Sequence, residues 1–416
     1  MEKENVDCLS NETKLLHEPY RARDAYNSLN MPIYHAVAYE FETAEQMELA
    51  FTGKSPEHVY SRISNPTVQY FEQRVKTVTN ASEVMSFNSG MAAIVNAIMT
   101  VAYNGGNIVT SPHLFGNTYS FFAFTLKDFG VETRFCDLTK PDEVKANIDK
   151  NTCALFLEII TNPQMEVADL CVLSDICKAH GVPLIADTTI VPFTVFHADD
   201  FGVNIEVVSS TKYISGGATS LGGLILDYDS FDWLHSKKLQ YLANHGKLSA
   251  FSAKLRMEIY RNFGACMTPQ VAHMQTTGME TLAIRYERAA ETCKKLAEKI
   301  TALPNISSVN YPSLPNHPYY AVSLRQFGEY AGAMFTFDLA SREAAFRFIN
   351  NLKLIRRATN LFDNKTLAIH PASTIFGTFT EQTRKSMDIS QNTIRISVGL
   401  ESIDDLYNDI KQATEK

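Results

Sequence analysis

A single lysine follows an apolar run in a setting that suits covalent chemistry. Lys212 comes after the apolar run 205–209 and the hydroxyl pair Ser210-Thr211, and a glycine pair follows at 216–217. A lysine at the end of a buried strand loses solvation, which lowers its pKa and frees a nucleophilic amine that can form a Schiff base. The alternative is an ordinary surface lysine after a strand, and this motif alone favours that alternative.

Two further segments have the residue types needed to bind charged parts of a cofactor. Asp187 follows the apolar run 182–186, where a carboxylate could bind a cationic ring nitrogen or cap the next helix. Residues 89–93 (SGMAA) pass through small residues into a helix, and the exposed N–H groups of such a turn bind anions such as phosphate. A simple capped helix start is the alternative for residues 89–93, and by itself it is favoured.

Together the three segments supply what pyridoxal 5'-phosphate (PLP) needs from a protein. Ligand sites of open α/β sheets form outside the carboxyl ends of the strands, where we expect these segments to lie. The segments provide an anchor for a phosphate, a partner for a pyridinium nitrogen and an imine-forming amine. Neither GxGxxG nor GxxxxGK[ST] occurs, so dinucleotide and P-loop sites lack their usual signature. The combination therefore points to PLP as the cofactor.

Short apolar runs that alternate with helical periods position these segments. The expected strands are 83–87, 107–111, 131–136, 153–160, 182–186, 205–209 and 223–226, and the expected helices are 91–102, 118–129 and 168–180. This alternation is typical of βαβ units. It predicts an α/β fold with a mostly parallel sheet covered by helices.

We expect three parts along the chain. Residues 1–62 form an N-terminal arm, residues 63–260 the cofactor-binding domain and residues 261–416 a smaller C-terminal α/β domain. A helix at 249–263 links the last two parts, and a strongly amphipathic helix at 286–303 follows it. It has expected strands at 334–339 and 393–398 and a helix at 342–352.

Composition and charge argue against several classes of protein. The 416 residues carry 38 basic and 46 acidic side chains, a formal net charge of −8, which argues against a general nucleic-acid binder. The N-terminal residues lack an apolar segment, so we expect no secretory signal, and no run is long enough to span a membrane. The seven cysteines include no CxxC pair and the histidines no HExxH. We therefore expect a cytoplasmic protein with reduced thiols and no metal site.

Several ordered motifs of the chain match one family of enzymes. The sequence resembles the Cys/Met-metabolism family of PLP enzymes, which includes cystathionine γ-synthases, cystathionine and methionine γ-lyases and O-acylhomoserine sulfhydrylases. The resemblance runs from about Thr13 to the C-terminus. It rests on Tyr60-Ser61-Arg62, Asn65-Pro66-Thr67, Ser89-Gly90-Met91, Asn162-Pro163, Asp187-Thr188-Thr189, Ser209-Ser210-Thr211-Lys212, His370-Pro371-Ala372-Ser373 and Arg395-Ile396-Ser397-Val398-Gly399.

This resemblance implies a fold-type I PLP-dependent transferase that assembles as a homotetramer, a dimer of dimers with shared active sites. Lys212 would be the catalytic residue and would hold the cofactor covalently. Asp187 would pair with the ring nitrogen, Phe115 would stack on the ring, and Asn162 would lie near the ring hydroxyl.

The resemblance also implies three sets of residues for anionic groups. The cofactor phosphate would be bound by the backbone N–H groups of Gly90 and Met91, with Ser209 and Thr211. The phosphate of the neighbouring subunit would be reached by Tyr60 and Arg62. The substrate would be bound by Asn360 and Arg395, because a planar guanidinium suits an α-carboxylate.

Five positions depart from the patterns of particular family members. Phe115 stands where most members carry a tyrosine, and Asn117 where methionine γ-lyases carry a cysteine. Ser120 and Thr359 stand where cystathionine enzymes tend to carry an arginine and a glutamate, so an amino-acid-sized thiol has fewer polar partners. Phe362 replaces a common glycine, and we expect it to narrow the pocket. A small sulfur nucleophile therefore fits better, and residues 358–361 with Asp363 and residues 365–367 resemble the same segment of the O-acetylhomoserine sulfhydrylases.

The predicted activity is γ-replacement on an O-acylhomoserine, with O-acetylhomoserine favoured, by sulfide to give homocysteine in methionine biosynthesis. The alternatives are a γ-lyase of methionine or homocysteine, a cystathionine γ-synthase and, more remotely, a non-catalytic PLP-binding regulator. The expected partners are an amino-acid substrate and a sulfur donor. That donor could be free sulfide, a thiol or a sulfur-carrier protein, and the acyl group could also be succinyl or phosphoryl.

Overall fold

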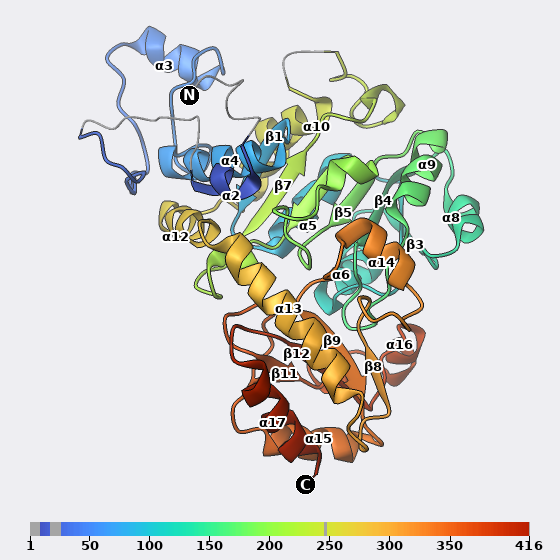
Figure 1. Ribbon diagram of the computed structural model, residues 1–416. Helices are drawn as coiled ribbons and strands as arrows, with labels where there is room; N and C mark the ends of the chain where they lie inside the picture. Colours follow the sequence, from blue (N-terminus) through green and yellow to red (C-terminus); the bar gives the residue numbers. More distant parts are fainter. Residues whose placement is uncertain (1–8, 17–25, 245–247, 416) are drawn as a thin grey trace.

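In the computed structural model, a twisted sheet of mostly parallel strands forms the upper part of the molecule (Figure 1). The structure describes residues 9–16, 26–244 and 248–415. Within these residues the sheet has seven strands in the order β1-β7-β6-β5-β4-β2-β3. Only β7 runs antiparallel to its neighbours β1 and β6. The strands are β1 Glu83–Phe87, β2 Asn107–Thr110, β3 Glu132–Phe135, β4 Thr152–Glu158, β5 Leu184–Asp187, β6 Ile205–Val208 and β7 Gly223–Asp227.

Helices cover both faces of this sheet (Figure 1). The helices of this part are α2 Asn11–Leu16, α3 Ala44–Phe51, α4 Pro66–Thr79, α5 Gly90–Val101, α6 Gly116–Ser120, α7 Leu126–Asp128, α8 Pro141–Asn147, α9 Leu170–His180, α10 Ala250–Lys254 and α11 Tyr260–Phe263. Alternate side chains of β4 show the two faces. Ala154 and Phe156 pack in the cluster with α5 and α10, whereas Leu155 and Leu157 pack in the cluster with α4 and α9. The predicted α/β architecture is confirmed, because successive side chains of a strand point to opposite faces and both faces are apolar.

A second, smaller sheet follows in the C-terminal part. Its order is β10-β11-β12-β9-β8, and only β10 and β11 are parallel. Its strands are β8 Ser308–Asn310, β9 Met334–Asp338, β10 Arg356–Arg357, β11 Leu367–Ile369 and β12 Thr393–Ser397. The helices of the C-terminal part are α12 Pro269–Met279, α13 Leu282–Ile300, α14 Tyr320–Phe327, α15 Arg342–Asn351, α16 Glu381–Ser386 and α17 Ile403–Thr414. The boundary at residue 260 stays a prediction, since one apolar cluster runs through both parts.

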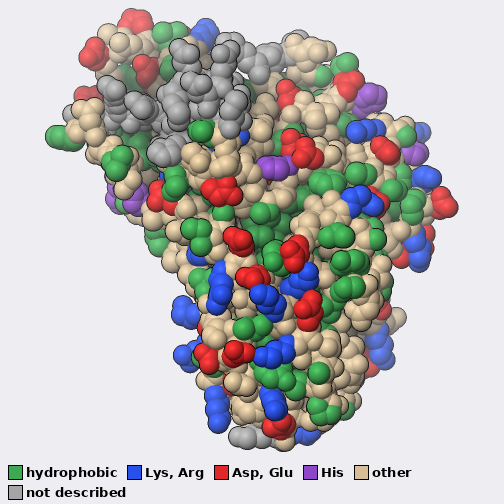
Figure 2. All heavy atoms as spheres, in the orientation of Figure 1, with side chains coloured by type: hydrophobic (Ala, Val, Ile, Leu, Met, Phe, Trp, Pro, Cys, Tyr) green, Lys and Arg blue, Asp and Glu red, His purple; other side chains and the backbone are tan. Residues whose placement is uncertain are grey.

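The long helix α13 runs from the large sheet down to the small one (Figure 1). Its buried side chains lie on one face, and Lys299 on its outer face pairs with Asp404 of α17 at 2.8 Å. Figure 2 shows Lys/Arg and Asp/Glu side chains interspersed over this part of the surface. Mixed charges of this kind keep the face from forming a field of one sign.

Several elements differ from the expected ones. The predicted helix 118–129 is split into α6, a π-helical turn (η1, Phe121–Thr125) and α7. Helix α4 was absent from the expected elements, although Asn65 caps it by accepting from the N–H of Thr67 at 3.0 Å and Pro66 opens it. Asn followed by Pro is an N-terminal helix signal that periodicity alone overlooks. Among the described residues, no helix combines the length and apolar character needed to cross a bilayer.

Candidate functional site

A cleft of about 720 Å³ opens where the carboxyl ends of β4, β5 and β6 face the start of α5 and the C-terminal part. The strand order makes these ends neighbours, as expected for an open α/β sheet. Ten of the predicted site residues line this one cleft. They are Gly90, Met91, Phe115, Asn162, Asp187, Ser209, Thr211, Lys212, Asn360 and Arg395.

Lys212 lies just beyond β6 and extends into the cleft. Its Nζ donates a hydrogen bond to Oδ1 of Asn360 at 2.8 Å. Burial, reinforced by the positive charge of Arg395, lowers the pKa of Lys212 to about 8, although Asp187 opposes that shift. A substantial fraction of the amine is therefore neutral near physiological pH, which is the state that attacks a carbonyl.

Asp187 is the last residue of β5 and is held by a turn. Its Oδ1 accepts from the N–H of Thr189 at 2.9 Å and from the Thr189 hydroxyl at 2.5 Å. Burial raises the pKa of Asp187, against the hydrogen bonds from Thr189 and the charge of Lys212. The helix-cap alternative is wrong, because the described residues after Asp187 form a turn and not a helix. A half-buried carboxylate in this setting favours a cationic partner.

The start of α5 packs so closely on the end of β6 that only glycine fits there. A Cβ on Gly90 would lie 2.7 Å from Cβ of Ser209 and 2.8 Å from its Oγ. Ser89 caps the helix by accepting from the N–H of Ala92 at 3.1 Å. The first N–H groups of a helix have no intrahelical partner and carry partial positive charge. Gly90, Met91 and the hydroxyl of Ser209 thus form a corner suited to phosphate.

Arg395, on β12, is a buried cation with neutral partners. Its guanidinium donates to Oδ1 of Asn162 at 3.2 Å and to the carbonyl oxygens of Thr359 at 3.2 Å and Asn360 at 3.3 Å, and its Nε has no partner. Its side chain is 1% exposed, and burial lowers its pKa to about 9. No ion pair to Arg395 occurs within the described residues, so its charge is available to a carboxylate ligand.

Glu158, which the sequence analysis did not single out, is the neighbour of Asp187 in the sheet and also lines the cleft. Its Oε1 accepts from the backbone N–H of Phe115 at 2.7 Å. Burial and the charge of Asp187 raise the pKa of Glu158 well above its ordinary value. A glutamate inside the apolar run 153–160 is a signal that could have identified this residue.

These side chains fit PLP. The cleft combines an amine of lowered pKa, a half-buried carboxylate for a ring cation, a glycine corner for a phosphate and a guanidinium for a carboxylate. Polar and charged groups are costly to bury without a partner. The cofactor and its substrate would supply a partner for each of these groups.

Comparison with known proteins agrees with this chemistry. The family model for the Cys/Met metabolism PLP-dependent enzymes matches residues 12–415. The chain belongs to this family. O-acetyl-L-homoserine sulfhydrylase 1 of Thermus thermophilus is 35% identical, over 97% of this chain and 99% of the relative.

Two solved structures of similar proteins extend the comparison. The O-acetylhomoserine sulfhydrylase of Wolinella succinogenes is 44% identical, with a TM-score of 0.76 over 85% of this chain and 98% of that one. A Campylobacter jejuni protein provisionally named O-acetylhomoserine (thiol)-lyase is 34% identical, with a TM-score of 0.94 over 98% of this chain and 100% of that one. The Campylobacter structure contains a pyridoxyl-lysine phosphate.

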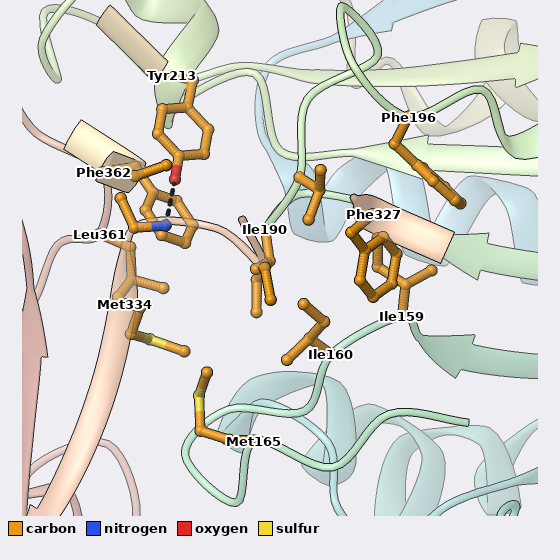
Figure 3. Packing of buried hydrophobic residues seen from close by; sticks show 14 of the residues in the cluster. Ile159, Ile160, Met165, Ile190, Phe196, Tyr213, Phe327, Met334, Leu361 and Phe362 are labelled. Carbon is orange, nitrogen blue, oxygen red and sulfur yellow. Dashed lines mark hydrogen bonds between the residues drawn. The ribbon is translucent and has the colours of Figure 1, made fainter. Parts of the chain in front are cut away.

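In this PLP-dependent enzyme, Phe362 does not narrow the cleft, contrary to the expectation. Its ring is 2% exposed and stacks on Tyr213, with ring centroids 4.3 Å apart and an angle of 13° between the planes (Figure 3). Tyr213 in turn accepts a hydrogen bond from the N–H of Ala333 at 3.0 Å. The backbone of Phe362 has a φ of 57°, which directs its ring into the core beside the residue that follows Lys212.

Tyr60 and Arg62 are the predicted site residues that lie outside the cleft lining. Arg62 donates to the carbonyl oxygen of Arg261 at 2.6 Å and lies over the Tyr60 ring, 5.4 Å from its centroid. Tyr60 is 39% exposed. Within one chain, these two residues do not contribute to the cleft.

Proposed function

We propose that this enzyme makes homocysteine by γ-replacement, in which sulfide displaces acetate from O-acetylhomoserine. The names of its relatives support the reaction class. The charge of the cleft supports the substrate: Lys212 and Arg395 are the only cationic side chains among the described residues that line it. One substrate carboxylate can therefore be paired, whereas the second carboxylate of a succinyl ester has no cation in the same chain.

Different residues of the cleft would bind different parts of the cofactor and the substrate. We assign covalent attachment of PLP to Lys212, pairing with its ring nitrogen to Asp187 and contact with its ring to Phe115. The phosphate is assigned to Gly90, Met91, Ser209 and Thr211. Asn162 is assigned to the ring hydroxyl, and the substrate carboxylate to Arg395 with Asn360. When bound, PLP supplies an electron sink for charge that develops at the substrate α-carbon.

Lys212 is the group that moves protons in this proposal. Its pKa of about 8 lets the same amine accept a proton from Cα and return it near neutral pH. Lys212 also accepts the second proton, from Cβ, the Cγ–O bond breaks to release acetate, and the incoming sulfide forms the Cγ–S bond. The protons are then returned to Cβ and Cα. Arg395 holds the carboxylate through these steps and keeps the reacting carbons within reach of Lys212.

The proposal is tested by a matrix of acyl donors against sulfur nucleophiles with product identification. We expect homocysteine and acetate from O-acetylhomoserine and sulfide, and turnover at least about 100-fold slower with O-succinylhomoserine or O-phosphohomoserine. In K212A we expect no turnover above background. Cystathionine formed efficiently from cysteine would instead identify a cystathionine γ-synthase. Rapid release of 2-oxobutanoate and ammonia without a nucleophile would identify a γ-lyase, and no turnover of any pair would identify a non-catalytic PLP-binding protein.

Free sulfide is the sulfur donor that we propose. The two positions at which cystathionine enzymes tend to carry an arginine and a glutamate offer no charge to a cysteine-sized thiol, since Ser120 lies outside the described lining and Thr359 is uncharged. Thiols and sulfur-carrier proteins are the alternative donors. A KM for sulfide so high that a thiocarboxylate or persulfide carrier outcompetes it would contradict this assignment.

For the assembly we propose a homotetramer, a dimer of dimers, in which residues 1–62 contribute to the neighbouring active site. Tyr60 and Arg62 lie outside their own cleft, and the segment before them exposes apolar side chains, including Val37 (66%) and Phe51 (57%). We also place the enzyme in the cytoplasm, since the six cysteines that the structure describes are all unpaired.

Sharing of sites between subunits is tested by mixing two inactive variants, R62Q and K212A. A hybrid dimer keeps one complete site, with Lys212 from one chain and Arg62 from the other. Random mixing therefore restores about one quarter of the wild-type activity if Arg62 acts on the neighbouring site. No restoration in verified hybrids would show that Arg62 acts within its own chain. Mass measurement in solution checks the tetramer.

A further inference from the structure

Glu158 is a cleft residue that the proposed reaction leaves without a role. It ends β4, directly opposite Asp187 in the register of the sheet, and both side chains line the cleft. Two carboxylates in such positions repel each other, and burial adds to the cost of charging either one. An apolar residue could fill the same space without this electrostatic cost, so the carboxyl group of Glu158 needs a role of its own.

The contact that Glu158 makes is with the backbone of Phe115. Its Oε1 accepts from the Phe115 N–H at 2.7 Å. Phe115 precedes α6 and has no side-chain cap, so this carboxyl group satisfies an N–H at the start of the helix. The carbonyl oxygen of Phe115 accepts from the N–H of Tyr119 at 2.9 Å, within the same helical turn.

The position of the Phe115 ring depends on the Phe115 backbone, because the side chain has no polar atom that could form a hydrogen bond. A tyrosine at this position could be oriented by its hydroxyl, whereas a phenyl ring is placed only by packing and by the chain that carries it. The next residue, Gly116, packs against the carbonyl oxygen of Ile375, which a Cβ would approach to 2.5 Å. The hydrogen bond to Glu158 and the packing of Gly116 against Ile375 thus restrain the Phe115 backbone from two sides.

We propose that Glu158 is a positioning residue, which fixes Phe115 in the wall of the cofactor cleft by accepting the hydrogen bond from its backbone N–H. The inference rests on the proposed function, because it takes Phe115 to contact PLP. Glu158 does not touch the substrate in this proposal, and it acts on the cofactor through Phe115.

The test measures the dissociation constant of PLP from the tetrameric enzyme without substrate, together with visible circular dichroism of the bound cofactor. E158Q keeps an oxygen acceptor and loses the acid, and we expect PLP affinity within about twofold of wild type. E158L leaves the Phe115 N–H unpaired, and we expect about tenfold weaker binding and a weaker dichroic band. E158M is a second variant without an acceptor, for use if E158L does not fold.

A double-mutant cycle with F115A decides whether Phe115 carries the effect. We expect E158L to weaken PLP binding by less than about twofold in the F115A background, because the ring that it positions is gone. An undiminished tenfold loss in that background would overturn the proposal, as would E158Q binding as weakly as E158L or E158L binding as tightly as wild type.

The matched control is E72L. Glu72 likewise accepts a backbone N–H, that of Ser86 at 2.8 Å, but it is buried and lies outside the cleft lining. We expect E72L to lower thermal stability and to leave PLP affinity unchanged. All these measurements omit the substrate. A failure of the sulfhydrylase assay would therefore contradict the proposed reaction and leave the role of Glu158 to be judged separately.

Discussion

The ionisable side chains at the cleft are all shifted toward their neutral forms by burial. The pKa values of Lys212 and Arg395 are lowered to about 8 and about 9, and those of Asp187 and Glu158 are raised. Neighbouring charges add to this effect or oppose it. Arg395 lowers the pKa of Lys212 further, whereas Asp187 raises it. A change of one charge at this site is therefore expected to shift the protonation of its neighbours.

At this scale we predict that N360D makes Lys212 less reactive. Asn360 accepts from the ammonium at 2.8 Å, and a carboxylate there would stabilise the charged form and raise the pKa of Lys212 by about one unit. Only the neutral amine attaches PLP, so the attachment rate rises with pH through this pKa. We expect its midpoint to move from about 8 toward about 9. The measurement is the rate of visible absorbance change after PLP is added to apoprotein at different pH values.

The control for this prediction is N351D, at the end of α15 and away from the cleft lining. It introduces the same charge into the chain, and we expect the midpoint to stay near that of the wild type. An unchanged midpoint in N360D would show that the contact between Asn360 and Lys212 does not set the amine's pKa.

At the scale of elements, the site depends on a helix start pressed against two strands. Gly90 opens α5 against the end of β6, and Gly223 opens β7 against the carbonyl oxygen of Ser89, which a Cβ would approach to 2.2 Å. Backbone approaches this close bring N–H groups and hydroxyls from different elements to one corner. Any side chain at these glycines must push those elements apart.

We predict that G90A damages both stability and cofactor binding. The added Cβ would meet Ser209 at 2.7 Å, so either the start of α5 or the end of β6 must move. We expect a loss of about 1–3 kcal/mol in the free energy of unfolding and at least about tenfold weaker PLP binding. Thermal unfolding of the apoprotein and PLP titration measure the two effects.

G105A serves as the control, because a Cβ there would meet no atom within 4 Å. Its backbone φ is +88°, so we expect a stability cost of about 1 kcal/mol and unchanged PLP affinity. PLP affinity that survives intact in G90A would mean that this corner does not bind the phosphate.

At the scale of the whole molecule, the cleft forms between two sheets and depends on contacts that join them. His113, two residues before Phe115, contacts Glu166 at 3.1 Å and Asp388 of the C-terminal part at 3.0 Å. Close by, Gln164 donates to the carbonyl oxygen of Met387 at 2.6 Å. These contacts tie the loops beside the cleft to the smaller part.

We predict that the contribution of His113 to stability depends on pH. Burial lowers its pKa, but the carboxylates of Glu166 and Asp388 outweigh burial, so the pKa lies above the ordinary 6.5. The folded state thus binds the proton more tightly than the unfolded state. The stabilisation is complete below about pH 6.5 and disappears as the pH rises through the raised pKa.

The measurement is the difference in Tm between wild type and H113Q as a function of pH. We expect a difference of about 1–2 °C more at acidic than at alkaline pH, since Asp388 is largely exposed and solvent screens its charge. D388N should reduce this pH dependence by about half. A difference in Tm that stays constant with pH would exclude a role for the charge.

Much of the fold follows from local patterns in the sequence. The seven strands of the described large sheet lie within two residues of their expected bounds, because short apolar runs separated by helical periods encode buried strands directly. Helices α4 and α12 were missed, although each begins at a proline preceded by a capping residue, Asn65 and Thr268, because the expected elements were taken from apolar periodicity and not from these start signals. Propensity and spacing do not encode the antiparallel pairing of β9 and β12, which are separated by 54 residues of chain between Asp338 and Thr393.

By itself, the sequence determined the chemical types of the site, namely a lysine, an aspartate and a glycine turn at strand ends, and an arginine within a strand of the C-terminal part. Only the tertiary structure decided their partners: Asn360 with Lys212, Glu158 with Phe115, and Phe362 with Tyr213. The physical reason is that strand and helix signals act over a few residues. The contact between Lys212 and Asn360 joins positions 148 residues apart. It exists only because the large sheet and the C-terminal part face each other across the cleft.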